Sequence, residues 1–339
     1  PGGSGGGRLK ARPEDFEVDE VPAYAPTGEG AHLFVRLRKW DVSGPLLVKT
    51  LARRWSVSPG DIGVAGVKDR RAVTTQWVSL PARDLDPACL SGPVGDGGQI
   101  QVIESALHGQ KLRTGHLRGN RFCVTVTERD PAEDESALEA LSHYAEHGFP
   151  NTFGHQRFTP DALKGGMAIL QGGRSMKSRR DRFAVSAIQS LVFNHWLASR
   201  NEGCGILHID EGTLLQRRDS GGVFVCEDPN VERERLARGE LTVAGRLPGS
   251  RPSGATGVAA AQERDALTRA GLKAEDFRPL GKKAQGGHRA SIAWPQDASG
   301  ERTERGLQLR FTLPSGSYAT VLLGLICGPG LRSGSPPSP

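Results

Sequence analysis

The stretch LFVRLR, Leu33 to Arg38, places apolar side chains at every second position, with arginines at two of the positions between them. Successive side chains of a strand point to opposite faces of its sheet, so this pattern predicts a strand with one buried face. The same alternation recurs in residues 121–127 and 307–313. Alternating strands, as opposed to continuously apolar ones, favour an antiparallel or mixed sheet over a doubly wound parallel sheet.

Helices are expected between these strands. Ser43 is a suitable amino-terminal cap for an apolar segment that runs to Trp55, and Pro131 begins an acidic first turn of a helix that ends near Gly148. A longer helix is predicted from Asp181, as its cap, past Trp196. Helices interleaved with a mixed sheet predict an α/β protein of the α+β type.

The length of 339 residues favours two domains. Residues 204–257 consist of short strand-like pieces between charged turns, whereas residues 307–313 restore the pattern of the first half. This return predicts a domain inserted into another domain. The ends of the chain, residues 1–8 and 328–339, are rich in glycine, serine or proline and are predicted to be disordered tails.

The five cysteines form no CxxC pair, which predicts reduced thiols in a cytosolic protein and argues against a zinc ribbon. His143 and His147 have the spacing of helical metal ligands, but Tyr144 stands where a metalloprotease helix needs glutamate, so we expect ordinary surface histidines. No stretch approaches the ~20 apolar residues of a membrane span. We therefore expect a soluble, unsecreted protein without a metal site.

Positive charge is clustered along the chain, although the excess of 44 Lys and Arg over 38 Asp and Glu is modest. The basic clusters lie at residues 36–39, 53–54, 68–71, 111–121 and 174–182. Such clusters suit a polyanion such as nucleic acid, whose phosphates supply much of the affinity. Arginines that only solvate the surface would give the same pattern, and composition leaves both interpretations open.

Asp69 lies in the segment GVAGVKDRRAVTTQW, Gly63 to Trp77, where Lys68, Arg70 and Arg71 flank its carboxylate. Neighbouring positive charge favours the ionised form of an acid, which can then act as a nucleophile or as an electrostatic stabiliser. An aspartate in a glycine-containing segment is also a common solvated turn residue. The local sequence leaves the choice open.

Four further residues allow two interpretations each. Phe16 and Phe122 lie near basic residues and could stack on a nucleobase, but their local sequence also suits a buried position on a strand. Asn120 could hydrogen-bond a base edge or form a turn with Gly119. Tyr318 could present its ring to a base or pack in the turn that follows residues 310–315.

Taken together and in order, these segments resemble the TruD family of tRNA pseudouridine synthases. The resemblance extends from about Leu9 to Leu325. Its most specific parts are residues 12–16 (RPEDF), 63–77, 118–122 (RGNRF), 150–158 (PNTFGHQRF) and 310–320 (RFTLPSGSYAT).

The resemblance implies a discontinuous catalytic domain with the mixed sheet of pseudouridine synthases, over residues 9–153 and 293–327. A family-specific TRUD domain is expected to interrupt it at residues 154–292. The implied activity is that of an isomerase, an intramolecular transferase that converts uridine 13 in the D-arm of tRNA to pseudouridine. The implied partner is tRNA, no cofactor is implied, and we expect a cytoplasmic monomer.

The resemblance also assigns roles to individual residues. The active-site aspartate of the family falls on Asp69 and its nearby asparagine on Asn120. Its base-contacting aromatic residues fall on Phe16, Phe122 and Tyr318, although the last is usually phenylalanine in the family. Lys10 and Lys68 are expected to bind phosphate or to tune the charge of the site.

Two other functions share much of this pattern. An RNA-binding or tRNA-folding module would depend on Arg174, Arg179 and Arg180 and would not require Asp69. A cofactor-free enzyme acting on another base or RNA would share Asp69 and the aromatic residues. No GxSxG or GxGxxG segment is present, so an elbow hydrolase or a dinucleotide-binding enzyme has no support.

Overall fold

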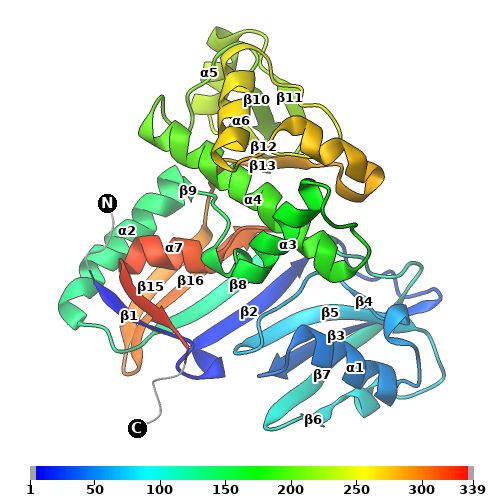
Figure 1. Ribbon diagram of the computed structural model, residues 1–339. Coiled ribbons are helices and arrows are strands. Elements are labelled where there is room, and N and C mark those ends of the chain that lie inside the picture. Colours follow the sequence, from blue (N-terminus) through cyan, green and yellow to red (C-terminus); the bar gives the residue numbers. More distant parts are fainter. Residues whose placement is uncertain (1–4, 335–339) are drawn as a thin grey trace. The chain divides into compact units, whose positions relative to one another are not determined.

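The computed structural model describes residues 5–334, which divide into two compact units. Unit 1 contains the described residues up to Gly148 and from Trp294 onward, and unit 2 spans Phe149–Ala293. The polypeptide therefore leaves unit 1 once and returns to it, as a domain insertion requires (Figure 1).

Unit 1 is built on one sheet of nine strands. The strands are β2 (Phe16–Pro22), β3 (His32–Trp40), β4 (Gly63–Val64), β5 (Val73–Pro81), β6 (Gly92–Val94), β7 (Gly98–His108), β8 (Leu117–Val126), β15 (Gln296–Thr303) and β16 (Gly306–Pro314). Their order is β15-β16-β8-β2-β5-β3-β7-β6, and β4 pairs with β5. Only the pair β2 and β5 is parallel, so the predicted mixed sheet is confirmed.

The alternating pattern divides this sheet into two faces. Val18 on β2 lies opposite Phe122 on β8, which lies opposite Phe311 on β16, so these three side chains share a face. Val35 and Leu37 of β3 point to the same face of the sheet, and both are fully buried. We call this the apolar face.

Helices α1 (Gly44–Arg54), α2 (Asp134–His147) and α7 (Ala319–Cys327) belong to unit 1, together with the short 3-10 helices η1 (Pro13–Asp15), η2 (Pro59–Asp61), η3 (Pro87–Leu90) and η4 (Pro131–Glu133). In Figure 1, α1 and α7 lie in front of the sheet. Ser43 caps α1 as predicted, because its side chain accepts a hydrogen bond from Leu46 N. Leu47, Leu51 and Trp55 then bury against Val35 and Leu37 of the apolar face.

The two ends of the described chain pair with each other. Strand β1 (Gly6–Leu9) lies parallel to β17 (Gly330–Ser333), where the sequence predicts disordered tails. Glycine allows the close packing of β1: a Cβ on Gly6 would lie 3.0 Å from Gly330 O of β17. A Cβ on Gly7, which has a φ of 134°, would lie 2.6 Å from Val126 Cγ1 of β8. Leu9 is buried at the end of β1. The remainder of the predicted tails, residues 1–4 and 335–339, lies outside the described residues.

Unit 2 has a four-stranded antiparallel sheet in the order β11-β10-β12-β13. These strands are β10 (Leu214–Arg217), β11 (Val223–Val225), β12 (Leu241–Leu247) and β13 (Gly287–Ala290), and β9 (Phe149–Pro150) pairs separately with β14 (Ile292–Ala293). The helices are η5 (His155–Arg157), α3 (Pro160–Leu170), α4 (Arg179–Glu202), α5 (Pro229–Ala237), α6 (Gly257–Arg269) and η6 (Ala274–Ala284).

Helix α4 supplies much of the core of unit 2 through Phe193 and Trp196. The predicted cap, Asp181, is wrong: the cap is Ser178, whose side chain accepts a hydrogen bond from Asp181 N at 3.1 Å. The Asp181 carboxylate in turn accepts a hydrogen bond from Ser178 N at 2.8 Å. This reciprocal capping box starts the helix three residues earlier. None of the helices in residues 5–334 is both long and apolar enough to cross a bilayer.

Candidate active site

Asp69 lies in an irregular loop between β4 and β5 in unit 1. Its side chain is about half exposed, at 48%. The ammonium group of Lys10 donates a hydrogen bond to Asp69 Oδ2 and forms an ion pair with it. The candidate catalytic carboxylate is therefore reachable from solvent and is held by a cation from a distant part of the sequence.

Lys10 links this carboxylate to an aromatic ring. Its side chain is buried, and its Nζ lies 4.2 Å from the centroid of the Phe16 ring. A cation above an aromatic face at this distance is attracted by the negative face of the ring. The backbone of Lys10 is left-handed, with a φ of 57°, which is uncommon for a residue other than glycine. Such strain at a site residue is consistent with a functional constraint.

Three phenylalanines from three strands continue from Lys10. The rings of Phe16 on β2 and Phe122 on β8 are 6.0 Å apart and nearly perpendicular, at 70°. Phe122 lies 5.4 Å from Phe311 on β16, at 31°. All three rings are buried. The structure thus brings together four predicted site residues, Asp69, Lys10, Phe16 and Phe122, in one series of contacts, and it adds Phe311.

Asn120 lies two residues before Phe122 and on the same face of β8, opposite Glu20 of β2 and Leu313 of β16. Its Oδ1 atom is buried and makes no hydrogen bond within residues 5–334. A buried acceptor without a donor is unfavourable, so this atom can accept a hydrogen bond from a ligand. Tyr318 is half-buried at the cap position of α7, directly after the turn that follows β16.

The three cations next to Asp69 in the sequence hold the loop on other elements. Lys68 forms a buried ion pair with Glu20 of β2, at 2.7 Å. Arg71 donates from Nε to Lys10 O at 2.6 Å and from a terminal nitrogen to Ala11 O at 2.5 Å. Arg70 is exposed and lies 3.4 Å from Asp41. The loop is therefore anchored on both sides of Asp69.

Sequence reasoning missed Lys39 and Glu20, which support this loop. Lys39 is fully buried on β3, and its Nζ donates to Asp69 O at 2.7 Å and to Val42 O at 2.8 Å. Burial lowers the pKa of Lys39 to about 8, with the positive charge of Lys68 acting in the same direction and Asp69 opposing it. Both residues share the parity of the apolar positions on their strands, which is the signal that could have identified them.

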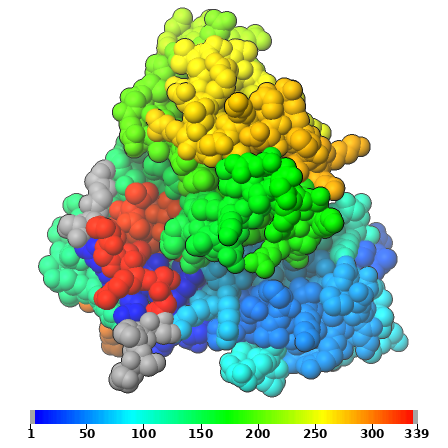
Figure 2. Space-filling model, in the orientation of Figure 1, coloured from blue at the N-terminus to red at the C-terminus, as the bar shows by residue number. Residues whose placement is uncertain are grey.

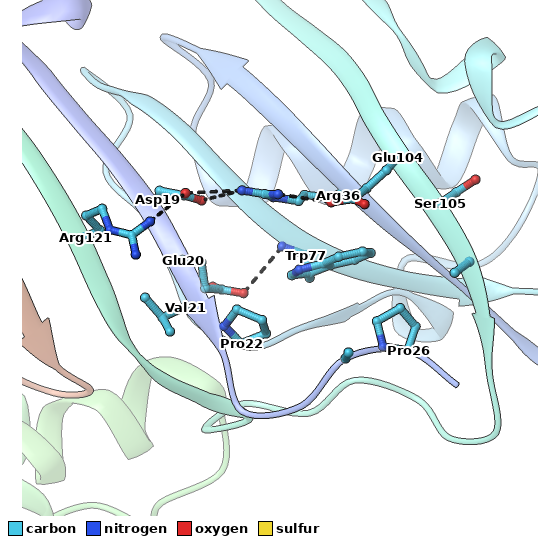
Figure 3. A pocket seen from close by; sticks show the side chains of 12 residues that line it. Asp19, Glu20, Val21, Pro22, Pro26, Arg36, Trp77, Glu104, Ser105 and Arg121 are labelled. Carbon is cyan, nitrogen blue, oxygen red and sulfur yellow. Dashed lines mark hydrogen bonds and ion pairs between the residues drawn. The ribbon is translucent and has the colours of Figure 1, made fainter. Parts of the chain in front are cut away.

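A cavity of about 470 Å³ lies in unit 1, and Asp69 is not among the residues that line it (Figure 3). Asp19 and Arg121 line it and lie opposite each other on β2 and β8, one position out of phase with the pair Val18 and Phe122. They therefore point to the other face of the sheet. Figure 3 shows Arg36 between Asp19, at 3.2 Å, and Glu104, at 3.0 Å. The ion pairs in this cavity occupy its charged groups.

Unit 2 carries the basic segment predicted to meet a polyanion. Lys177, Arg179 and Arg182 are exposed before and within the first turn of α4, whereas Arg174 pairs with Asp181 and Arg180 pairs with Asp161. Figure 2 shows the green region that contains α3 and the beginning of α4 at the surface of unit 2. No group of three or more potential metal ligands occurs among residues 5–334.

Comparison with known proteins gives a consistent result. The family model described as tRNA pseudouridine synthase D (TruD) matches residues 2–173 and 168–324. The chain is 42% identical to tRNA pseudouridine synthase D of Anaeromyxobacter sp. (strain Fw109-5), over 94% of this chain and 91% of the relative. It is 39% identical to a Thermus thermophilus protein of the same name, over 94% and 88% of the two chains.

A solved structure agrees with these sequence matches. The crystal structure of a protein described as a putative tRNA pseudouridine synthase D from Methanosarcina mazei has a TM-score of 0.73 to this chain. The two are 25% identical, and the match covers 96% of this chain and 94% of the other. The similarity thus extends over both units.

Proposed function

This chain belongs to the TruD family of tRNA pseudouridine synthases, and we propose that it isomerises uridine 13 in the D-arm of tRNA with Asp69 as the essential catalytic residue. One observation carries the assignment of the residue: in a chain of this family, the Asp69 carboxylate is bonded to buried Lys10, which lies over the Phe16 ring. We assign catalysis to unit 1. Unit 2 is the family-specific TRUD domain, expected over residues 154–292.

The reaction needs no external reagent. The N1–C1′ glycosidic bond of uridine breaks, the uracil turns, C5 bonds to C1′, and the proton on C5 is replaced by one on N1. Atoms and electrons balance within the nucleotide, so neither a redox agent nor a nucleoside triphosphate is consumed. One carboxylate is sufficient as the nucleophile, or as the stabiliser of charge on the ribose or base.

The target base must leave the stack of the RNA helix before Asp69 can reach it. Phe16 and Phe122 are buried, so they form the floor of the uracil site and present only part of their rings. Tyr318 is half-buried and supplies a more accessible ring. Asn120 Oδ1, which makes no hydrogen bond among the described residues, is suited to accept one from uracil N3–H.

The two predicted lysines take different roles in this proposal. Lys10 holds the carboxylate of Asp69 directly. Lys68 is buried with Glu20, so its charge is neutralised within the protein and its role is to anchor the loop. Phosphate binding falls to exposed cations such as Arg179 and Arg182. We further propose a cytoplasmic monomer, which sedimentation at micromolar concentration and cell fractionation can check.

The decisive experiment compares Asp69→Asn with wild type on an unmodified tRNA transcript, with pseudouridine mapped at nucleotide resolution. We expect the rate to fall by about 10⁴-fold, as when a central catalytic group is removed. Asp84→Asn, at an exposed aspartate elsewhere in unit 1, is the matched control and should retain the wild-type rate. Wild-type activity should persist after treatment with EDTA and dialysis.

Two results would contradict parts of this proposal. A folded Asp69→Asn protein that modifies tRNA at the normal rate would remove Asp69 from catalysis and would favour the RNA-binding alternative if its biological effect were retained. Pseudouridine at a position other than 13 would refute the choice of target and leave the reaction unchanged.

A further inference from the structure

We propose that Lys39 is a positioning residue that fixes the loop carrying Asp69 by bonding to the backbone carbonyl oxygen of Asp69. This inference rests on the proposed catalytic role of Asp69 and adds a residue that acts on it from beneath the loop.

The geometry of Lys39 is specific. It lies near the end of β3, opposite Thr74 of β5 and Ile100 of β7, and its side chain is fully buried. Its Nζ donates to Asp69 O at 2.7 Å and to Val42 O at 2.8 Å. One ammonium group thus joins the catalytic loop to the segment after β3, which in turn starts α1. Bonds of this length from a charged donor are strong and directional.

A lysine at this position is unfavourable for folding on its own account. The preceding residues of the same parity, Val35 and Leu37, are apolar and fully buried, so an apolar side chain would continue the pattern. Taking an ammonium group out of water has an effective penalty of several kcal/mol even after partial compensation. A group retained against such a penalty next to a candidate catalytic residue indicates a functional role.

Lys39 acts on the main chain of Asp69, whereas Lys10 acts on its side chain and the remaining restraints act on its neighbours. Lys68 fixes the loop before Asp69 through Glu20, and Arg71 fixes it after Asp69 through backbone carbonyls. Lys10 binds the side chain. Lys39 bonds to the main chain of Asp69, and this contact fixes the position of the backbone from which the carboxylate projects.

The charge of Lys39 changes with pH near pH 8. Burial lowers its pKa to about 8. The charged groups that act on it are Asp69 and Asp41, which favour the ammonium form, and Lys68, which opposes it. Each of these groups has its own partner: Lys10 for Asp69, Arg70 for Asp41 and Glu20 for Lys68. As pH rises through about 8, the charge-assisted bond to Asp69 O becomes a weaker neutral one.

The test compares Lys39→Met with Lys49→Met, the same substitution at an exposed lysine on α1. Methionine keeps the length of the side chain and removes the donor. For Lys39→Met we expect kcat to fall by about 10²-fold, the scale of a 1 Å misplacement, with KM for tRNA changed less than about threefold. Wild-type kcat should fall above pH 8, and this alkaline decline should be missing in Lys39→Met. Lys49→Met should match wild type in every measurement.

Limited trypsin digestion examines the loop without reference to activity. Arg70 is an exposed trypsin site in the loop. Trypsin should cleave the chain after Arg70 faster in Lys39→Met than in Lys49→Met, because the loop opens more often without the Lys39 bond. The cleavage rate reports on the Lys39 contact even if the wild-type protein makes no pseudouridine. In that case the proposed function is wrong, and the role of Lys39 in holding the loop is still tested. If Lys39→Met does not fold, the wild-type pH profile decides, and a flat kcat from pH 7 to 9.5 overturns the proposal. An unchanged kcat or an unchanged cleavage rate at Arg70 in a folded Lys39→Met protein also overturns it.

Discussion

Lys10 and Asp69 are 59 residues apart in the sequence, and the Lys10 ammonium group is bonded to the Asp69 carboxylate. Lys10 is buried and Asp69 is half exposed, so the pair has one end in the protein and one end facing solvent. The buried cation orients the carboxylate without closing it off. This asymmetry suits a group that must meet a large substrate.

Replacement of Lys10 by methionine tests this pair. Asp69 loses its orienting cation, and we expect kcat to fall by about 10²-fold, as when one preorganised electrostatic partner is removed. KM for tRNA should change little, because the buried ammonium group is not available to phosphates. Steady-state kinetics on the tRNA transcript give both constants. A kcat equal to that of Lys49→Met would exclude an orienting role for Lys10.

Asn120→Ala tests the buried acceptor. Because Asn120 Oδ1 makes no hydrogen bond among residues 5–334, its removal should leave the melting temperature nearly unchanged. If it accepts a bond from uracil, kcat/KM should fall by about 10- to 100-fold, which corresponds to about 1–3 kcal/mol for one such bond. Thermal unfolding and kinetics on the same preparation check the two expectations together. A lower melting temperature with normal kcat/KM would assign Asn120 to the fold.

Tyr318→Phe tests whether the departure from the usual family residue matters. Phenylalanine keeps the ring, so kcat and KM should stay within about threefold of wild type, whereas Tyr318→Ala should lose more than about tenfold in kcat/KM because base–aromatic stacking is worth about 1–3 kcal/mol. Single-turnover kinetics with both variants separate binding from chemistry. A tenfold loss in Tyr318→Phe would show that the hydroxyl group takes part.

Charge at the beginning of α4 should govern tRNA affinity. The double variant Arg179→Ala/Arg182→Ala removes two exposed cations, and we expect weaker binding and a smaller slope of log affinity against log salt, by about 1 for each phosphate that these arginines neutralise. Arg264→Ala/Arg269→Ala removes two exposed arginines from α6 and is the matched control. Binding titrations at several salt concentrations measure both. Equal slopes for the two double variants would show that α4 does not contact the RNA.

The stability of the protein should depend on pH through Lys39. Its pKa is about 8 in the folded state against 10.5 as the ordinary value, so between these pH values the unfolded chain holds a proton that the folded protein has released. The free energy of unfolding must then rise with pH across this range, by about 3 kcal/mol for this group. Well below pH 8 the folded protein must bury Lys39 in its charged form, so the full cost of this burial lowers the free energy of unfolding.

Denaturant unfolding at pH 7.5 and pH 10 measures this effect. Other titrating groups contribute equally to wild type and Lys39→Met, so the difference between the two proteins isolates Lys39. At pH 7.5 we expect the free energy of unfolding of Lys39→Met to exceed that of wild type. At pH 10 most of this difference between the two proteins should disappear. A difference that does not vary with pH would mean that Lys39 titrates normally.

Much of the sheet was predictable from local patterns. The alternating segments at 33–38, 121–127 and 307–313 coincide with β3, β8 and β16, apart from residue 127 just past the end of β8, and Ser43 caps α1 as expected. The predicted cap at Asp181 failed because a capping box contains two polar residues, and only the backbone geometry distinguishes the cap from its partner three residues later. The predicted tails failed because β1 and β17 depend on pairing between the two ends of the chain.

The candidate site was predictable in part. Family resemblance assigned Asp69, Asn120, Phe16, Phe122 and Tyr318. The structure places four of the predicted residues in one series of contacts, from Asp69 through Lys10 and Phe16 to Phe122. Lys39 and Glu20 were missed, although a charged residue in the apolar parity of a strand is visible in the sequence. Their partners, Asp69 for Lys39 and Lys68 for Glu20, could not be predicted from the sequence, because both lie in a loop without periodicity.

The sequence by itself determined three strands of the unit 1 sheet, the first helix and the mixed character of the sheet, because side-chain alternation and capping act over a few residues. It also determined the family, through ordered segments spread along the chain. Only the tertiary structure decided which cation meets Asp69. Lys68, Arg70 and Arg71 are its neighbours in sequence, yet their side chains leave the loop toward Glu20, Asp41 and the carbonyls of residues 10 and 11. Lys10 and Lys39 reach Asp69 because folding brings distant segments of the chain together, and a local pattern carries no information about such distances.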